Sequence, residues 1–217
     1  MTQDFSDGRL FIGGDWRKGR GAPITSVFAA EGIENQTLAG ASRDDALDAI
    51  AAAGAAQQDP AWRDLKPHER ATHLHRIADG IAANIDRISW IQSRDTSKTL
   101  AETRALALSA AGTFRYFAAV VETSDDLLTA PRGDYLTSSV HEPLGVVAAI
   151  TPWNSPIASD AQKVAPALAA GNAVVLKPAS WSPLVCLELA RIIDEAGLPR
   201  GLFSVLPGSG REVGTLL

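Results

Sequence analysis

Apolar residues in the first half of the chain recur at the intervals of a helix. From residue 74 onward, leucine or isoleucine returns every three or four residues, which predicts a helix with one buried face after Pro67. The residues on this face are Leu74, Ile77, Ile81, Ile85 and Ile88. Because the spacing is not interrupted, we expect one continuous helix.

Four further segments before residue 141 have patterns of their own. Residues 10–16 read as two short strands around a Gly-Gly turn, and residues 135–140 read as a strand. An alanine-rich run over 45–56 predicts a helix with Ser42 as its N-cap, because a hydroxyl there accepts a free backbone N–H. A third helix is predicted over 101–121.

The second half of the chain has a different pattern. Three short apolar runs, at 145–150, 173–176 and 203–206, alternate with helical segments at 160–170 and 183–196. Continuous apolar runs are typical of parallel strands that are buried on both faces. The alternation is a βαβαβ pattern and predicts an α/β protein with a doubly wound parallel sheet.

The last residues bear on where the chain stops. A new helix is predicted to begin at Arg211, but the sequence ends at Leu217 without the glycine, asparagine or proline that usually ends a helix. We therefore expect residues 1–217 to be the front part of a longer protein.

Composition narrows the classes of partner and compartment. The net charge of −5 and the pI near 5.4 leave no basic surface for nucleic acid. No signal peptide or membrane-spanning apolar run is recognisable, so no membrane association is expected. The single cysteine, Cys186, excludes an internal disulfide and favours a reducing compartment, so we expect a cytoplasmic protein.

Candidate chemistry lies where the first two predicted parallel strands end. Ligands of open α/β sheets bind beyond the carboxyl ends of the strands. After the first run come Thr151, Pro152, Trp153 and Asn154, and after the second comes the segment 177–180, which is Lys-Pro-Ala-Ser. An amide and a cation are therefore expected at one edge of the sheet.

The residues at these strand ends also carry a resemblance. The segments 142–147 (EPLGVV), 151–154 (TPWN), 165–172 (APALAAGN) and 175–178 (VLKP) together resemble the aldehyde dehydrogenase superfamily in both order and spacing. The segments 11–16 (FIGGDW) and 205–208 (VLPG) are similar to it as well. The resemblance thus covers nearly the whole chain.

The resemblance implies a fold and a domain organisation. It implies a helical N-terminal region followed by an incomplete Rossmann-like parallel sheet, which together form part of a cofactor-binding domain. Residues 1–140 would be the N-terminal strands and helices, and residues 141–217 the first βαβαβ unit. The catalytic domain would be absent from this chain, and the full-length protein would be a homo-oligomer.

The resemblance also implies a reaction. In the family a cysteine thiolate attacks an aldehyde, a hydride passes to NAD or NADP, and the thioester is hydrolysed to the acid. Asn154 matches the asparagine whose amide stabilises the oxyanion, although an isolated asparagine between prolines would more often be a turn residue. The family's cysteine and general-base glutamate would lie beyond residue 217, so the chain alone is expected to be inactive.

Residues around both strand ends would contact the cofactor. Lys177 matches the lysine that donates to the adenosine ribose, and Pro178 and Ala179 continue that segment. Trp153, with Thr151 and Pro152, would lie beside the cofactor, and packing in the core is the equally weighted alternative for the tryptophan. Gly210 would border the adenine, unless it serves only as a turn residue with a positive φ.

Ser180 stands where many NAD-preferring relatives have glutamate. A glutamate carboxylate would repel the 2′-phosphate of NADP, whereas a serine would not and could donate to that phosphate. We therefore expect NADP to be tolerated alongside NAD. In the substrate tunnel, Ser155 stands where the family often has phenylalanine, and Gln162 stands where semialdehyde-specific relatives have arginine, so a dicarboxylic semialdehyde is not favoured.

Other polar residues are given structural interpretations. Cys186 lies on an apolar helix face and is interpreted as a buried, unreactive thiol. His73 and His75 are two residues apart on a helix and cannot share a metal, so no metal site is predicted. The pairs Asp44-Asp45 and Asp125-Asp126 are interpreted as solvated charges at helix ends.

Two further functional interpretations remain open on the sequence. One is a non-catalytic fragment that binds nucleotide or interferes with assembly of a full-length relative. The other is a related enzyme that acts on an acyl phosphate or a CoA thioester. The leading hypothesis is an NAD(P)-dependent oxidoreductase acting on a small-molecule aldehyde.

Overall fold

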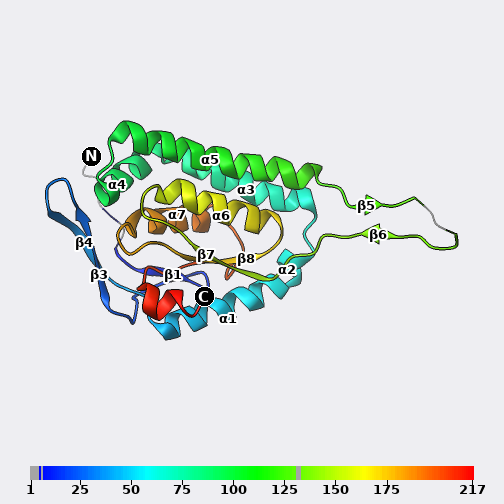
Figure 1. Cartoon of the computed structure of the whole chain (residues 1–217), viewed down its shortest axis with the longest axis horizontal. Helices are drawn as coiled ribbons and strands as arrows, with labels where there is room; N and C mark the ends of the chain where they lie inside the picture. Colours follow the sequence, from blue (N-terminus) through cyan, green and yellow to red (C-terminus); the bar gives the residue numbers. More distant parts are fainter. Residues whose placement is uncertain (1–4, 6, 131–132) are drawn as a thin grey trace.

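A five-stranded sheet forms the centre of the computed structural model, which describes residues 5, 7–130 and 133–217. Its strands lie in the order β2-β1-β9-β8-β7 (Figure 1). Strands β7, β8 and β9 are parallel, and β1 runs antiparallel to both β9 and β2. The strand bounds are β1 Leu10–Ile12, β2 Asp15–Arg17, β7 Val146–Ile150, β8 Ala173–Lys177 and β9 Phe203–Val205.

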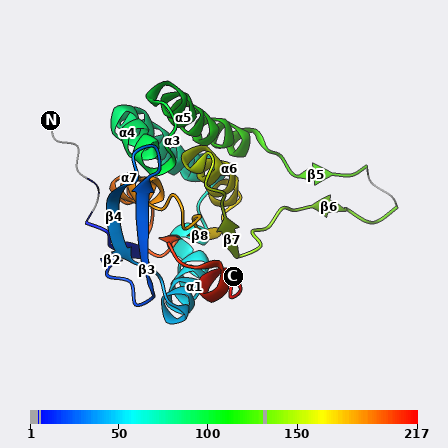
Figure 2. The same ribbon diagram turned by 60° about the vertical axis from the view of Figure 1, so that its left-hand side comes forward.

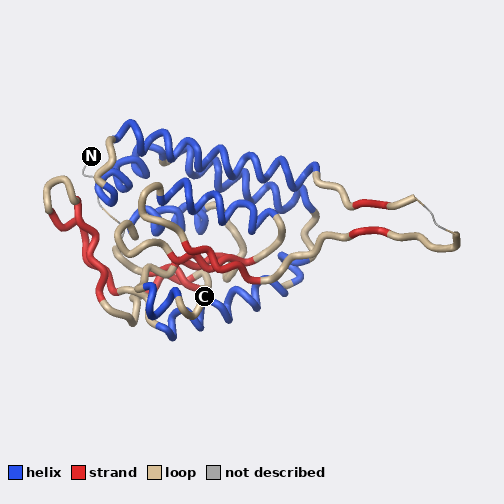
Figure 3. Tube along the Cα trace, viewed as in Figure 1, coloured by secondary structure: helices blue, strands red, loops and turns tan. Residues whose placement is uncertain are grey.

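Helices cover both faces of this sheet. Helix α1 packs on one face, against β1, β7, β8 and β9, and helices α6 and α7 pack on the other. Helices α3, α4 and α5 form a further layer outside α6 and α7 (Figures 1 and 3). The bounds are α1 Arg43–Gln58, α2 Pro60–Arg63, α3 Pro67–Ala83, α4 Ile85–Thr96, α5 Leu100–Thr123, α6 Pro156–Ala169 and α7 Leu184–Glu195.

The predicted βαβαβ unit is confirmed, because β7, α6, β8, α7 and β9 follow one another with the three strands in parallel register. The sheet is wider than predicted, since the N-terminal hairpin β1–β2 extends it through the pairing of Phe11 with Val205. Residues on both sides of position 140 therefore build one sheet, and its strand β8, which lies between β9 and β7, is buried throughout.

Two two-stranded hairpins lie outside the main sheet. Strands β3 (Pro23–Phe28) and β4 (Ile33–Ala39) form one, which the sequence analysis did not predict. Strands β5 (Leu127–Leu128) and β6 (Ser138–Ser139) belong to an arm, residues 124–130 and 133–144, that extends away from the body of the molecule (Figure 2). The strand predicted over 135–140 is therefore only two residues long.

The single helix predicted after Pro67 is wrong, because the chain breaks it at Asn84 into α3 and α4. Asn84 has φ −111° and ψ 18°, and its side-chain amide donates to the Gly80 carbonyl at 2.8 Å. Arg191 of α7 donates to the Asn84 side-chain oxygen at 3.0 Å. Tertiary contacts to α7 thus stabilise a bend that the apolar spacing does not indicate.

Burial of β7 on both faces was also predicted, and this is wrong. Val146 and Ile150 are 37% and 54% exposed, because β7 is the edge strand and pairs only with β8 among the described strands. Helix α6 begins at Pro156, four residues earlier than predicted. The helix predicted from Arg211 is a short π-helical turn, η1 (Gly210–Gly214).

Helix α1 begins with a capping box that is locked by an ion pair. Asp45 Oδ2 accepts the backbone N–H groups of Ser42 and Arg20, each at 2.9 Å, and Oδ1 accepts Arg20 Nε at 2.8 Å. Asp45 is fully buried, so its interpretation as a solvated charge is wrong. Burial alone would raise the pKa of Asp45, but these donors outweigh burial and lower it.

We predict that Asp45→Ala lowers the free energy of unfolding by about 3 kcal/mol, because it leaves buried donors without their charged acceptor. Asp48→Ala is the matched control, since Asp48 also pairs with Arg20 but is 47% exposed, and should cost less than about 1 kcal/mol. Urea unfolding of both variants measures the difference. Equal losses would contradict the structural account of Asp45.

Candidate functional site

The carboxyl ends of β7 and β8 are neighbours, so the two predicted site segments leave the sheet at the same edge. Ile150 pairs with Lys177 in the parallel register, and the Thr151 backbone N–H donates to the Lys177 carbonyl at 3.2 Å. The loop 151–155 therefore starts beside the loop 178–183. The two segments therefore leave one edge of the sheet, as predicted, and the functional roles of the Asn154 amide and the Lys177 ammonium stay predictions.

Asn154 is exposed in the bend between β7 and α6. The structure records no hydrogen bond from its side-chain amide to any described residue, so both amide protons are available to a ligand. Trp153 is 58% exposed, so it does not pack in the core of this chain, and its place beside the cofactor stays a prediction. The Ser182 hydroxyl contacts the Trp153 carbonyl at 3.4 Å and ties this bend to the neighbouring loop.

Lys177 ends the buried strand β8, and its side chain is held close to the protein. The residue is 5% exposed, and its Nζ donates to the Pro178 carbonyl at 3.1 Å. A Cβ on Gly214 would lie 3.5 Å from Lys177 Cε, so η1 covers the aliphatic part of the lysine. Burial lowers the pKa of Lys177, and the sulfur of Cys186 partly opposes this.

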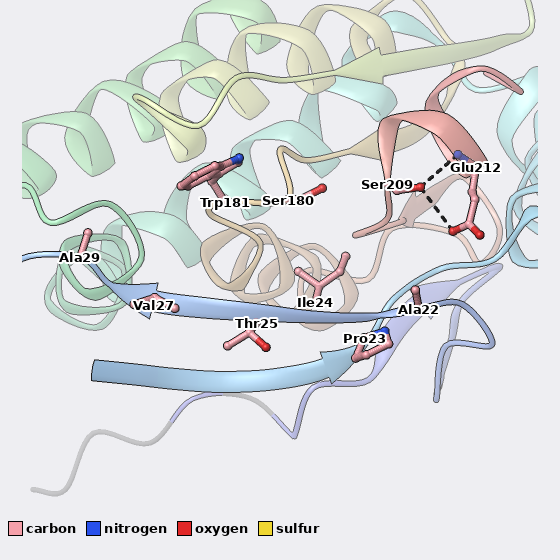
Figure 4. A pocket seen from close by; sticks show the side chains of 10 residues that line it. All are labelled: Ala22, Pro23, Ile24, Thr25, Val27, Ala29, Ser180, Trp181, Ser209 and Glu212. Carbon is pink, nitrogen blue, oxygen red and sulfur yellow. Dashed lines mark hydrogen bonds between the residues drawn. The ribbon is translucent and has the colours of Figure 1, made fainter. Parts of the chain in front are cut away.

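An apolar groove of about 600 Å³ lies along the same edge of the sheet, between β3 and the loops that follow β8 and β9 (Figure 4). Ser180 and Trp181 line it from the first loop, and Ser209 and Glu212 line it from the second. The Ser180 hydroxyl donates to the Gly208 carbonyl at 3.0 Å and joins the two loops. Lys177 does not line this groove.

Glycines allow η1 to pack closely beside the groove. A Cβ on Gly208 would lie 2.5 Å from a methyl carbon of Val213, so any other residue at position 208 would force Val213 to move. Gly210 begins η1 and is exposed, and a Cβ added to it would meet no heavy atom within 4 Å. The space at Gly210 is therefore open to a ligand, and its predicted role at the adenine stays a prediction.

The two predicted tunnel residues lie at different places on α6. Ser155 is the N-cap residue of α6 and is partly buried. Gln162 is exposed further along α6, where it lines a depression of about 660 Å³ against the edge strand β7, together with Lys163. Their assignment to a substrate tunnel stays a prediction, as do the contact roles of Pro152, Pro178 and Ala179.

Asp95 is a residue near the site that the sequence analysis missed. It is 4% exposed at the end of α4 and accepts the Ser26 hydroxyl at 2.6 Å and the Leu184 backbone N–H at 2.8 Å. It thereby fixes β3, one wall of the groove, to the start of α7. The residues next to Asp95 in the sequence are polar, so the sequence does not indicate that this aspartate is buried. Its burial is seen only in the folded structure.

A second buried acid, Asp160, lies on α6 below the loop 151–155. Among the described residues, neither its carboxylate oxygens nor the Thr151 hydroxyl makes a hydrogen bond of normal geometry, although the Thr151 hydroxyl and the Cys186 thiol lie nearby. Burial raises the pKa of Asp160 to about 6, and the nearby Cys186 thiol and Thr151 hydroxyl oppose this. Burial and the Asp160 charge raise the pKa of Cys186 well above its usual value. The only cysteine is therefore buried and protonated, as predicted.

Residues 16–217 match the sequence profile of the aldehyde dehydrogenase family. The chain belongs to this family. It is 35% identical over 207 residues to the betaine aldehyde dehydrogenase of Bacillus subtilis (strain 168), which covers 94% of this chain and 42% of that protein.

Solved structures of aldehyde dehydrogenases share the fold. KauB of Pseudomonas aeruginosa superposes with a TM-score of 0.93 at 33% identity, covering 97% of this chain and 43% of KauB. An apo indole-3-acetaldehyde dehydrogenase superposes with a TM-score of 0.95 at 31% identity, covering 100% of this chain and 51% of that chain. A point mutant of the betaine aldehyde dehydrogenase betB of Staphylococcus aureus, in complex with NAD+, superposes with a TM-score of 0.92 at 31% identity. This match covers 95% of this chain and 43% of the betB chain.

The chain therefore spans only about half the length of these aldehyde dehydrogenases, or less, and its sheet is that of their cofactor-binding domain. Across the residues that the structure describes, no group of three or more acidic, histidine or cysteine side chains could hold a metal ion. In the same part of the chain, no helix combines the length and apolarity needed to cross a bilayer.

The raised pKa of Asp160 predicts a pH-dependent contribution to stability. The native state keeps this proton up to about pH 6, whereas the unfolded state loses it near pH 3.9. The contribution of Asp160 to the free energy of unfolding is therefore greatest below about pH 4, falls as the pH rises to about 6, and is constant above that. Asp160→Asn should remove this decline.

Between pH 4 and pH 8, the free energy of unfolding of Asp160→Asn should gain about 2–3 kcal/mol relative to the parent chain. Urea unfolding across this range measures the gain, with Asp79→Asn, on the exposed surface of α3, as the control. Parallel pH profiles for parent and Asp160→Asn would show that Asp160 titrates normally.

Proposed function

We propose that this chain is the nucleotide-binding part of an NAD(P)-dependent aldehyde dehydrogenase that oxidises a small-molecule aldehyde to a carboxylic acid. The observation that carries the proposal is the adjacency of the Asn154 and Lys177 segments at the carboxyl ends of two parallel strands. Ligands of open α/β sheets bind at this position, and the NAD+ complex of the betB relative supports a nicotinamide cofactor.

In the proposed reaction, Asn154 stabilises the oxyanion that forms when a cysteine thiolate adds to the aldehyde carbon. The free amide protons of Asn154 suit this role, and the loss of one such donor typically costs about 10²–10³ in rate. Cys186 cannot be the nucleophile, because burial keeps its thiol protonated. We propose that the nucleophile and the general base come from residues outside these 217.

When bound, the nicotinamide would accept the hydride, and residues of this chain would hold the cofactor. Lys177 would donate to the adenosine ribose with the two ammonium protons that its bond to Pro178 leaves free. Trp153 would lie beside the cofactor, where its exposure leaves the indole accessible. Thr151 and Pro152 would shape the same loop.

We propose that NADP is accepted as well as NAD, because Ser180 places no negative charge at the groove. The sequence led us to expect that the Ser180 hydroxyl could also donate to the 2′-phosphate, and one hydrogen bond changes this expectation. Its hydroxyl proton is donated to Gly208, so while that bond persists it cannot also donate to a 2′-phosphate. The proposed tolerance of NADP therefore rests on the absence of a carboxylate at position 180.

Titration of NADH and NADPH into the chain, followed by nicotinamide fluorescence, tests both proposals. Lys177→Ala should weaken NADH binding about tenfold or more by removing a charge-assisted donor. Lys163→Ala, on the exposed side of α6, is the matched control. Ser180→Glu should weaken NADPH and spare NADH. If Lys177→Ala and Lys163→Ala bind NADH with the same affinity, the proposed role of Lys177 is wrong. If Ser180→Glu leaves the affinity for NADPH unchanged, the proposal that NADP is accepted because of Ser180 is wrong.

We also propose that the protein is a homo-oligomer, and the arm, residues 124–130 and 133–144, supports this. Its side chains Leu127, Leu128, Tyr135, Leu136 and Val140 are each at least 67% exposed. An exposed apolar surface of this kind is typical of a contact with another chain. No other described part of the chain projects so far from the body (Figure 2).

Leu127→Ser combined with Leu128→Ser should lower the sedimentation coefficient at a given protein concentration, because it removes apolar contact area from the arm. Leu108→Ser, at a 53% exposed position on α5, is the control and should leave the sedimentation coefficient unchanged. A monomeric parent chain, or parent-like association of the arm variant, would contradict the proposed role of the arm.

A further inference from the structure

The groove beside Ser180 contains one charged side chain, the carboxylate of Glu212, which has no role in the proposed reaction. Ten described residues line this groove, and Glu212 is the only charged residue among them. The other lining residues are apolar, except for three that carry hydroxyl groups: Thr25 of β3, Ser180 and Ser209 (Figure 4). Any ligand in this groove therefore meets one negative charge.

Local contacts fix the position of Glu212. The Ser209 hydroxyl accepts the Glu212 backbone N–H at 3.1 Å and donates to Glu212 Oε2 at 3.3 Å. Ser209 is also the N-cap of η1. Across the described residues, no arginine, lysine or histidine forms an ion pair with this carboxylate. Its charge is therefore not neutralised by the protein, and its oxygens can accept hydrogen bonds from a ligand.

The two loops that carry Ser180 and Glu212 follow adjacent parallel strands, β8 and β9, and the bond from Ser180 to Gly208 joins them. A sugar that reached Ser180 would therefore be bounded by the loop that carries Glu212. Ser180 has no free proton to offer a phosphate while this bond persists.

We propose that Glu212 determines how strongly this chain discriminates between the two forms of adenosine, accepting the free ribose 2′-hydroxyl and repelling a 2′-phosphate. This inference rests on the proposed function. A carboxylate is an acceptor only, so it binds a hydroxyl and repels a phosphate dianion at the same position. Ser180 permits NADP, and Glu212 limits its affinity relative to NAD.

The experiment compares two probes that contain only the adenosine half, 5′-AMP and adenosine 2′,5′-bisphosphate. Isothermal titration calorimetry gives the ratio of their Kd values for the chain. Glu212→Gln should shift this ratio about tenfold in favour of the bisphosphate, since an unscreened unit charge a few ångströms away contributes about that factor. Glu212→Asp, which keeps the charge, should retain most of the discrimination.

Two controls separate the charge in the groove from charge in general. Glu122→Gln removes an exposed carboxylate at the end of α5 and should leave the ratio unchanged. Raising the salt concentration should bring the ratio of the two Kd values closer to one for the parent chain, because mobile ions screen the repulsion. It should have little effect on this ratio for Glu212→Gln.

The outcomes distinguish the inference from the proposed function. If neither probe binds, the proposed nucleotide site is wrong and the inference falls with it. If 5′-AMP binds but Glu212→Gln leaves the ratio unchanged, or weakens both probes equally, the role of Glu212 is overturned while the nucleotide site stands.

Discussion

The carboxylate of Asp95 joins three segments that are far apart in the sequence. Lying at the end of α4, it accepts the Ser26 hydroxyl of β3 and the first two backbone N–H groups of α7, from Leu184 and Val185. Burial raises the pKa of Asp95 to about 7, although these donors oppose the rise. Hydrogen bonds to a charged group contribute about 1.5–3 kcal/mol each, so their loss would release both β3 and the start of α7.

The candidate site depends on this arrangement because its parts are carried by separate segments. Strand β3 forms one wall of the groove, and the loop that leads into α7 supplies Ser180 and Trp181. The loop after β9 supplies the opposite wall and is tied to Ser180 through Gly208. The parallel strands β8 and β9 determine only where these loops begin, so the buried contacts around them define the shape of the groove.

Much of the fold could be predicted from local pattern, and the failures share a cause. The βαβαβ unit and the Ser42 cap depend on residues close in sequence, and both were predicted. The break at Asn84, the exposure of β7 and the burial of Asp45 each depend on a distant partner or on the absence of one. At the site, the strand ends indicated that the Asn154 and Lys177 segments leave one edge of the sheet, but Asp95 and Glu212 became visible only once distant loops were brought together.

The pairing of Phe11 with Val205 joins residues that are far apart along the chain. During synthesis, β1 leaves the ribosome long before β9 exists, so the N-terminal hairpin has no neighbouring strand of the main sheet to join until β9 emerges. Contacts of such large sequence separation slow folding and keep an apolar strand accessible in the meantime. The nascent protein would therefore present Leu10–Ile12 to chaperones until β9 has been made.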